Sequence, residues 1–230
     1  MENTQPHLLK GSTELNAMFG ALARTATGLR RDFIEVEQLQ QSLSGARDFV
    51  AKAEQRIEQM ILRDLQLVRP NAGILTPNVS TDGNGISEFI LSFSGAENFV
   101  RANPHFAISL ALRVNGEMMA GLIYMPILDK LFYAERDMGT FIFQAHNSHR
   151  YRVTKLSNIE DVTIGGKNRI TGCVALDLAY VATGKFDAMV VDMPDYAEIA
   201  AGELMVVEAG GKVWEENGQL FASNGVVDIN

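Results

Sequence analysis

Apolar residues recur every three or four positions in two stretches of the N-terminal third, which is the spacing of one face of a helix. The first stripe comprises Leu15, Met18, Phe19, Leu22, Ala26, Leu29 and Phe33, and the second comprises Val50, Ala53, Ile57, Met60, Ile61 and Leu65. Lys52, Gln55, Glu58 and Arg63 fall between the apolar positions of the second stripe and are expected on its solvent side. The pattern predicts two amphipathic helices, the second ending before Pro70.

The middle of the chain changes to a period of two, which is typical of strands. Apolar residues alternate with others from Phe106 to Val114, and Asn115-Gly116 then fits a two-residue hairpin turn. Further segments at 118–125, 131–134 and 140–143 predict an antiparallel meander, whereas the turn formers of 76–87 predict a loop. We expect the two helices to form a layer on this meander.

The last third alternates helix and strand. Its predicted elements are a helix over 172–183 stopped by Gly184, a strand over 186–191, a helix over 199–209 closed by Gly210-Gly211, and a strand from 212. We therefore expect two units. Residues 1–155 form a helix pair with an antiparallel sheet, and 156–230 form a smaller α/β unit, with a boundary near 156–167 and one compact structural entity overall.

Composition excludes several classes of protein. The 230 residues carry 20 basic and 28 acidic side chains, a formal net charge of −8, which argues against direct nucleic-acid binding. No apolar run approaches the roughly 20 residues that cross a bilayer, and the first dozen residues do not form a signal peptide. The single cysteine, Cys173, excludes an internal disulfide and a multi-cysteine metal site. We expect a cytoplasmic protein without membrane contact.

Several phrases, in one order, resemble the inositol monophosphatase family. They are Asp48-Phe49-Val50-Ala51-Lys52-Ala53-Glu54, Asn98-Phe99, Phe106-Ala107-Ile108-Ser109-Leu110, Phe132-Tyr133-Ala134, Ala175-Leu176-Asp177-Leu178-Ala179, and Glu208-Ala209-Gly210-Gly211. The resemblance implies an α/β fold, a layered αβαβα sandwich, often dimeric, that hydrolyses inositol and sugar phosphates with magnesium. Between Ile164 and Arg169 the chain lacks a helix and a strand that the family usually has, so we expect a sandwich shortened in its C-terminal half.

The resemblance also implies metal-binding carboxylates, and most are replaced here. Thr76-Pro77-Asn78 stands where the family has an acidic pair. Leu91 and Ser94 stand at two aspartates of the next motif, and Ala96 stands at its threonine. Ala197-Glu198 replaces a Trp-Asp pair and keeps one carboxylate. Magnesium prefers anionic oxygen ligands, so these replacements predict a degenerate metal site.

The replacements have a local interpretation as helix starts. Ser94-Gly95-Ala96-Glu97 fits a capping box, and Asp195 to Glu198 and Ser157 to Glu160 repeat the pattern. We therefore interpret Glu97 and Glu198 as helix caps rather than metal ligands. Ser94, Gly95 and Ala96 remain a weak candidate phosphate-binding turn.

Other chemistry-bearing residues receive structural interpretations. His146 and His149 lie at an expected hairpin tip without a third metal ligand, and His105 stands at a strand entrance. Cys173 lies at an expected helix start but has no assigned basic partner to lower its thiol pKa, which argues against a nucleophile. Arg24, Arg30 and Arg31 are expected on a solvated helix face. The sequence contains no P-loop and no dinucleotide fingerprint.

Two functions remain open at this level. The first is a family member that is catalytically impaired or inactive, needs no cofactor, and serves as a dimeric interaction or regulatory protein with a protein partner. A dimer would also bury the apolar excess formed by Met118, Met119, Leu122, Tyr124 and Phe143. The alternative is an active magnesium-dependent phosphatase whose ligands are rebuilt from Glu54, Glu97 and Glu198. A small phosphorylated ligand is expected to bind weakly.

Overall fold

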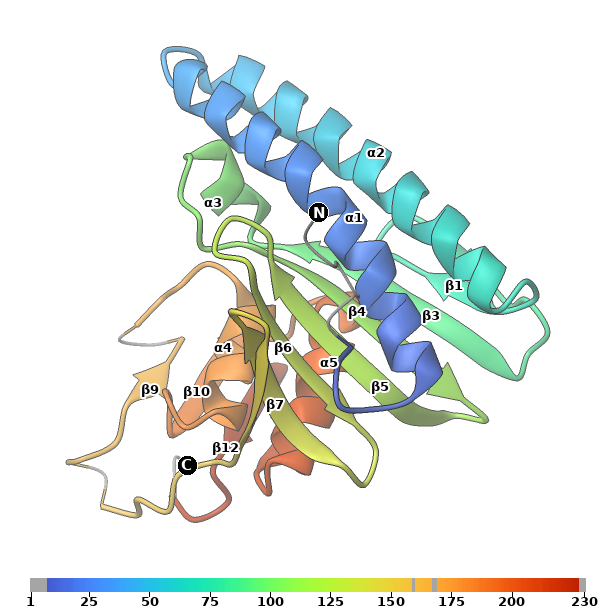
Figure 1. Cartoon of the computed structure of the whole chain (residues 1–230). Helices are drawn as coiled ribbons and strands as arrows, with labels where there is room; N and C mark the ends of the chain where they lie inside the picture. Colours follow the sequence, from blue (N-terminus) through green and yellow to red (C-terminus); the bar gives the residue numbers. More distant parts are fainter. Residues whose placement is uncertain (1–7, 159, 167–168, 228–230) are drawn as a thin grey trace.

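The computed structural model describes residues 8–158, 160–166 and 169–227. Both predicted N-terminal helices are confirmed and extend beyond their apolar stripes: α1 spans Thr13–Gln38 and α2 spans Leu43–Val68. Each follows a serine whose hydroxyl accepts a backbone N–H of the first turn, Ser12 for α1 and Ser42 for α2. The helices pack side by side as an antiparallel pair (Figure 1).

An eight-stranded sheet, called sheet A, lies under this pair, with the strand order β2-β1-β3-β4-β5-β6-β7-β8. The strands are β1 Gly73–Leu75, β2 Ser80–Thr81, β3 Ser87–Ser94, β4 Ala107–Val114, β5 Glu117–Met125, β6 Lys130–Glu135, β7 Gly139–Gln144 and β8 Asn147–Tyr151. Neighbours are antiparallel except β1 and β3, which are parallel. The meander is confirmed, and Asn115 and Gly116 both have positive φ in the predicted turn.

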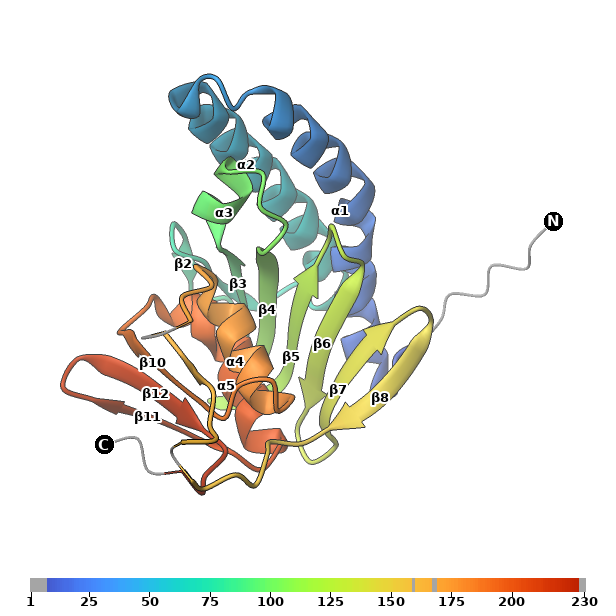
Figure 2. The ribbon, with the colours of Figure 1, turned by 90° about the vertical axis from the view of Figure 1, so that its left-hand side faces the viewer.

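Helices cover both faces of sheet A. Figure 2 shows α1 and α2 on one face, and α4 (Val174–Ala182) and α5 (Tyr196–Glu208) on the other. Leu122 and Tyr124 belong to the core under α1 and α2, whereas Met118 packs against the core under α4 and α5. Leu122 and Tyr124 are therefore buried within one chain and are no reason for a dimer, whereas Met118, Met119 and Phe143 are half-buried.

A second sheet, sheet B, follows the α4–α5 layer, with the order β11-β12-β10-β9. Its strands are β9 Ile164–Gly165, β10 Ala188–Asp192, β11 Lys212–Glu216 and β12 Gln219–Ser223. Gly184 and Gly210, each with positive φ, follow the ends of α4 and α5 as predicted. In the described part of the chain no helix lies beyond sheet B, so the outer helical layer of the expected sandwich is missing there.

Close backbone contacts fix α5 against its neighbours. A Cβ on Gly121 of β5 would stand 2.8 Å from the carbonyl oxygen of Ala201, and a Cβ on Gly202 would stand 2.5 Å from the Leu178 Cβ of α4. The core under α4 and α5 includes residues of both sheets, such as Phe132 and Leu220. Among the described helices, none has the length and apolar character that crossing a membrane would require.

Candidate functional site

The end of β3 lies against the first turn of α5, at the segment Ser94 to Ala96. Ser94, the last residue of β3, is fully buried, and its hydroxyl donates a hydrogen bond to Glu198 Oε2 at 2.9 Å. The Ser94 hydroxyl oxygen in turn accepts the backbone N–H of Ala175 at 3.4 Å, near the start of α4. Burial raises the pKa of the Glu198 carboxyl, and the hydrogen bond from Ser94 opposes that rise. Ser94 and Glu198 are therefore satisfied by protein groups.

The start of α4 packs directly on the same turn. Cys173 Sγ donates to the Ser94 carbonyl oxygen at 3.3 Å, and a Cβ on Gly95 would stand 3.0 Å from the Cys173 Cβ. Gly95 has φ +85°, a conformation that glycine adopts without strain. Burial raises the pKa of the Cys173 thiol to about 12, so the thiolate that a nucleophile requires is disfavoured.

The capping-box interpretation is wrong at Ser94. The short helix α3 (Ala96–Val100) begins after Gly95, with no side-chain cap, because the Ser94 hydroxyl is turned toward α5. Glu97 is exposed and pairs with Arg47 at 3.0 Å and Arg101 at 3.3 Å. The hydrogen bond from Arg47 lowers the pKa of Glu97. Glu97 is therefore neither a cap nor a member of the buried site.

The other two predicted boxes are also corrected. Asp195 does cap α5, accepting the Ala197 N–H at 2.8 Å, but Glu198 reaches Ser94 instead of returning to the cap. No helix begins at Ser157 in the described residues, where Asn158 Oδ1 accepts the Glu160 N–H at 3.2 Å in a turn. Ile159 of this box, and Lys167 at the expected unit boundary, lie outside the described residues.

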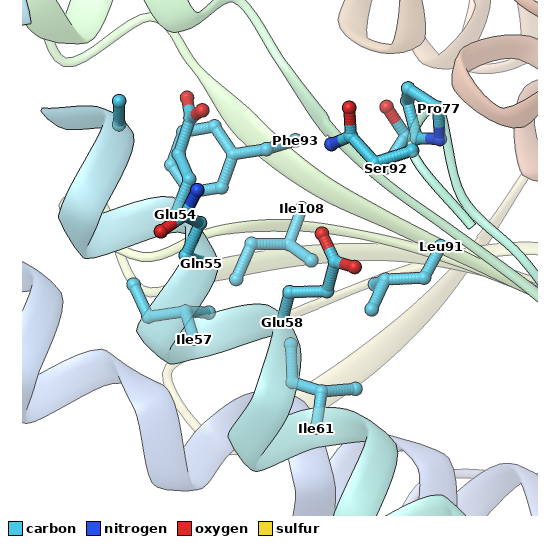
Figure 3. A pocket seen from close by; sticks show the side chains of 12 residues that line it. Glu54, Gln55, Ile57, Glu58, Ile61, Pro77, Leu91, Ser92, Phe93 and Ile108 are labelled. Atoms are coloured by element: carbon cyan, nitrogen blue, oxygen red, sulfur yellow. The ribbon is translucent and has the colours of Figure 1, made fainter.

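A cavity of ≈ 320 Å³ lies on the other side of β3, between that strand and α2. Leu91, 3% exposed, forms part of its wall at a position where the resemblance implies an aspartate. Figure 3 shows the Glu58 carboxylate between Ile108 and Leu91, and the Glu54 side chain beside Phe93. The side of α2 that bears these glutamates therefore faces a hollow rather than open solvent.

The two glutamates of the cavity differ in their partners. Thr76 Oγ1 donates to Glu58 Oε1 at 3.3 Å, whereas Glu54 Oε1 is buried and has no hydrogen-bond partner among the described residues. Burial, and then the nearby charge of Glu58, raise the pKa of Glu54 to about 7. The expectation that Glu58 lies on the solvent side is wrong, because the Thr76 turn folds over that face. In the sequence, the four-residue spacing between Glu54 and Glu58 places both side chains on one face of the helix, and this spacing indicates that they lie together.

The candidate ligands for a rebuilt metal site are not brought together. Glu54 lines the α2 cavity, Glu97 is exposed on α3, and Glu198 lies under Ser94. The described residues contain no group of three or more His, Cys, Asp or Glu side chains placed to hold a metal ion. They therefore do not fit the magnesium site that the resemblance implies.

The histidines and the arginine patch lie elsewhere. His146 is in the β7–β8 turn and His149 is in β8, paired with Ile142, so the expected hairpin tip is confirmed and β8 adds a strand that we did not predict. His105 packs 5.7 Å from the Tyr180 ring, and burial lowers its pKa. Arg24, Arg30 and Arg31 are exposed as expected, and Arg24 pairs with Asp64 across the helix hairpin.

Known proteins resemble this chain over most of its length. An inositol-1-monophosphatase of Mesorhizobium japonicum is 34% identical over 246 aligned positions that cover 94% of this chain and 91% of the relative. The alignment exceeds the 230 residues of this chain, so it includes positions of the relative that have no residue here. The Nus factor SuhB of Pasteurella multocida is 28% identical, with 89% and 85% covered.

Solved structures also resemble the fold of this chain. The crystal structure of the extragenic suppressor protein suhB from Bartonella henselae has a TM-score of 0.82 and 33% identity, and covers 93% of this chain and 95% of that one. The model of the inositol monophosphatase family matches residues 7–164 and 145–229. The chain therefore belongs to the inositol monophosphatase family.

Proposed function

We propose that this protein is a family member that has lost phosphate-ester hydrolysis and acts as a dimeric, cytoplasmic interaction protein without a metal cofactor. The hydrogen bond between Ser94 and Glu198 supports this proposal most directly, because it joins two positions where the family's metal-binding carboxylates are expected. Leu91 supports it further, since a buried leucine provides no metal ligand.

The names of the relatives support an interaction role. Some relatives of comparable coverage are named inositol-1-monophosphatase, and others are named Nus factor SuhB. Family members are thus named both as enzymes and as a factor. We infer that this chain belongs with those that act by binding a protein partner.

A metal titration with a phosphate-release assay tests the loss of hydrolysis. Calorimetry with MgCl₂ should give no heat of binding, and inositol 1-phosphate and fructose 1,6-bisphosphate should release no phosphate above the protein-free background. The Mesorhizobium japonicum relative serves as the positive control in the same buffer. Magnesium-dependent hydrolysis that is abolished by a chelator and by Glu198→Ala would overturn the proposal.

Light scattering tests the dimer separately. With a chain mass of 25.2 kDa, we expect a particle of twice that mass at micromolar concentration. A monomer mass under those conditions would remove the dimer from the proposal and leave the statement about hydrolysis untouched.

A further inference from the structure

The cavity between α2 and sheet A has the size and walls of a small-molecule site. Its volume of ≈ 320 Å³ lies at the lower end of the roughly 300–1,000 Å³ that is typical of ligand pockets. Apolar side chains from α2, β3 and β4 form much of its wall: Ile57, Ile61, Leu91, Phe93 and Ile108. These walls suit the hydrocarbon part of an organic molecule.

The cavity carries negative charge without a compensating cation. Among the described residues that line it, Glu54 and Glu58 are the only ionisable ones, and none is Lys, Arg or His. Neither glutamate takes part in the ion pairs found among the described residues. Glu54 Oε1 also lacks a hydrogen-bond donor there. A buried acceptor without a partner and two neighbouring carboxylates both favour a ligand that brings positive charge and N–H donors.

The walls distinguish between kinds of cation. Magnesium retains a shell of waters and needs several oxygen ligands, but Leu91 and Ile108 offer none, and the described residues hold no group of three metal-binding side chains. A phosphate group in the cavity would be repelled by the two carboxylates, because all three groups carry negative charge. We propose that this cavity binds a small organic ammonium ion, with the ammonium group at Glu54 and Glu58 and the hydrocarbon part against Leu91, Phe93 and Ile108. This inference goes beyond the proposed function and does not depend on it.

A matched series of ligands tests the proposal on the wild-type protein. Phenethylamine provides the cation, 2-phenylethanol a neutral molecule of the same shape, and phenylacetate an anion of similar size. Calorimetry at pH 8 should give one binding site for phenethylamine, binding of the alcohol that is weaker by about tenfold or more, and no binding of phenylacetate. Equal affinity for the amine and the alcohol, or tighter binding of phenylacetate, would overturn the proposal.

Variants locate the site. Glu54→Gln and Glu58→Gln should each weaken phenethylamine binding about tenfold. Glu203→Gln is the matched control, because Glu203 is also a half-buried glutamate whose pKa burial raises to about 7, but it lies on α5 outside the cavity. This control should bind like the wild type. Unchanged binding in both cavity variants, or equal loss in the control, would contradict the location.

A metal-only arm separates the organic ligand from a residual metal site. A titration with MgCl₂ alone should give no binding heat that depends on Glu58, so the wild type and Glu58→Gln should give the same result. Millimolar MgCl₂ should leave the affinity for phenethylamine unchanged. Displacement of the amine by MgCl₂ would show that the cavity is a metal site and would overturn the proposal. Phosphate release by the wild type would instead overturn only the proposed loss of hydrolysis, so the two failures are distinguishable.

Discussion

Ser94 Oγ donates to Glu198 Oε2 across 2.9 Å, although 104 positions separate the two residues in the chain. The bond ties the last residue of β3 to the first turn of α5. A serine hydroxyl can donate to a carboxylate, whereas a second carboxylate at this position would repel it unless a cation stood between them. The contact therefore gives each side chain a protein partner and links β3 to α5.

Removal of that donor should destabilise the protein. Ser94→Ala leaves the Glu198 carboxylate without the Ser94 hydroxyl, and we expect a loss of about 1–3 kcal/mol in the free energy of unfolding, measured by urea denaturation. Ser92→Ala is the matched control on the same strand and face, because the Ser92 hydroxyl is buried without a partner among the described residues. It should leave stability unchanged or raise it slightly, because no hydrogen bond is lost and a buried hydroxyl without a partner is removed. Equal effects of the two substitutions would contradict the role of the bond.

Restoration of the expected acidic positions should restore metal affinity without turnover. The combination Leu91→Asp, Ser94→Asp, Ala96→Thr and Glu198→Asp supplies oxygen ligands, so MgCl₂ should raise its midpoint of thermal unfolding but not that of the wild type. The same combination with Asn in place of each Asp is the uncharged control. Turnover should remain absent because Thr76, Pro77 and Asn78 provide no carboxylate. If the quadruple variant folds but MgCl₂ does not change its midpoint of thermal unfolding, the backbone does not have the shape of a metal site.

Two helix glycines should respond oppositely to alanine. A Cβ on Gly202 of α5 would stand 2.5 Å from the Leu178 Cβ, so Gly202→Ala should lower stability by about 1–3 kcal/mol. A Cβ on Gly28 of α1 meets nothing within 4 Å, so Gly28→Ala should raise stability by about 0.5–1 kcal/mol through helix propensity. Thermal and urea unfolding measure both changes. A stabilising Gly202→Ala would mean that α4 and α5 pack less closely than the structure shows.

The repeating patterns of the sequence predict much of the fold. The apolar stripes of α1 and α2 are strictly periodic, and the Asn115-Gly116 turn fixes the β4–β5 hairpin. Strand β3 was not predicted because helices cover both of its faces, so its residues are buried with little alternation. A strand of this kind has no period that distinguishes it from other apolar segments.

The site depends on contacts that local patterns do not contain. The spacing of Ser94 and Glu97 fits a capping box, but the positive φ of Gly95 and the packing of α4 direct the Ser94 hydroxyl to α5. Glu58 falls on the polar side of its helix by period alone, yet Thr76 donates to it from a distant turn. Such partners lie far apart in sequence, and only the tertiary structure brings them together.

The half-buried Glu54 of the α2 cavity should make stability depend on pH. Burial raises the pKa of Glu54 from its ordinary value of 4.5 to about 7 in the folded protein. Below pH 4.5 both states hold the proton and the residue contributes nothing. Between pH 4.5 and 7 the unfolded state ionises first, so stability falls as pH rises and stays reduced above pH 7. Glutamine cannot ionise, so Glu54→Gln should match the wild type near pH 4.5 and exceed it at pH 8.5 by roughly 1–3 kcal/mol, after allowance for solvent screening. Urea denaturation at several pH values measures the difference.

Glu97→Gln is the control of opposite sign, because Arg47 lowers the pKa of Glu97 and its charge favours the folded state. A difference in stability between Glu54→Gln and the wild type that stays constant from pH 4.5 to 8.5 would contradict the raised pKa of Glu54. Such a difference would come from packing, which does not depend on the protonation of Glu54.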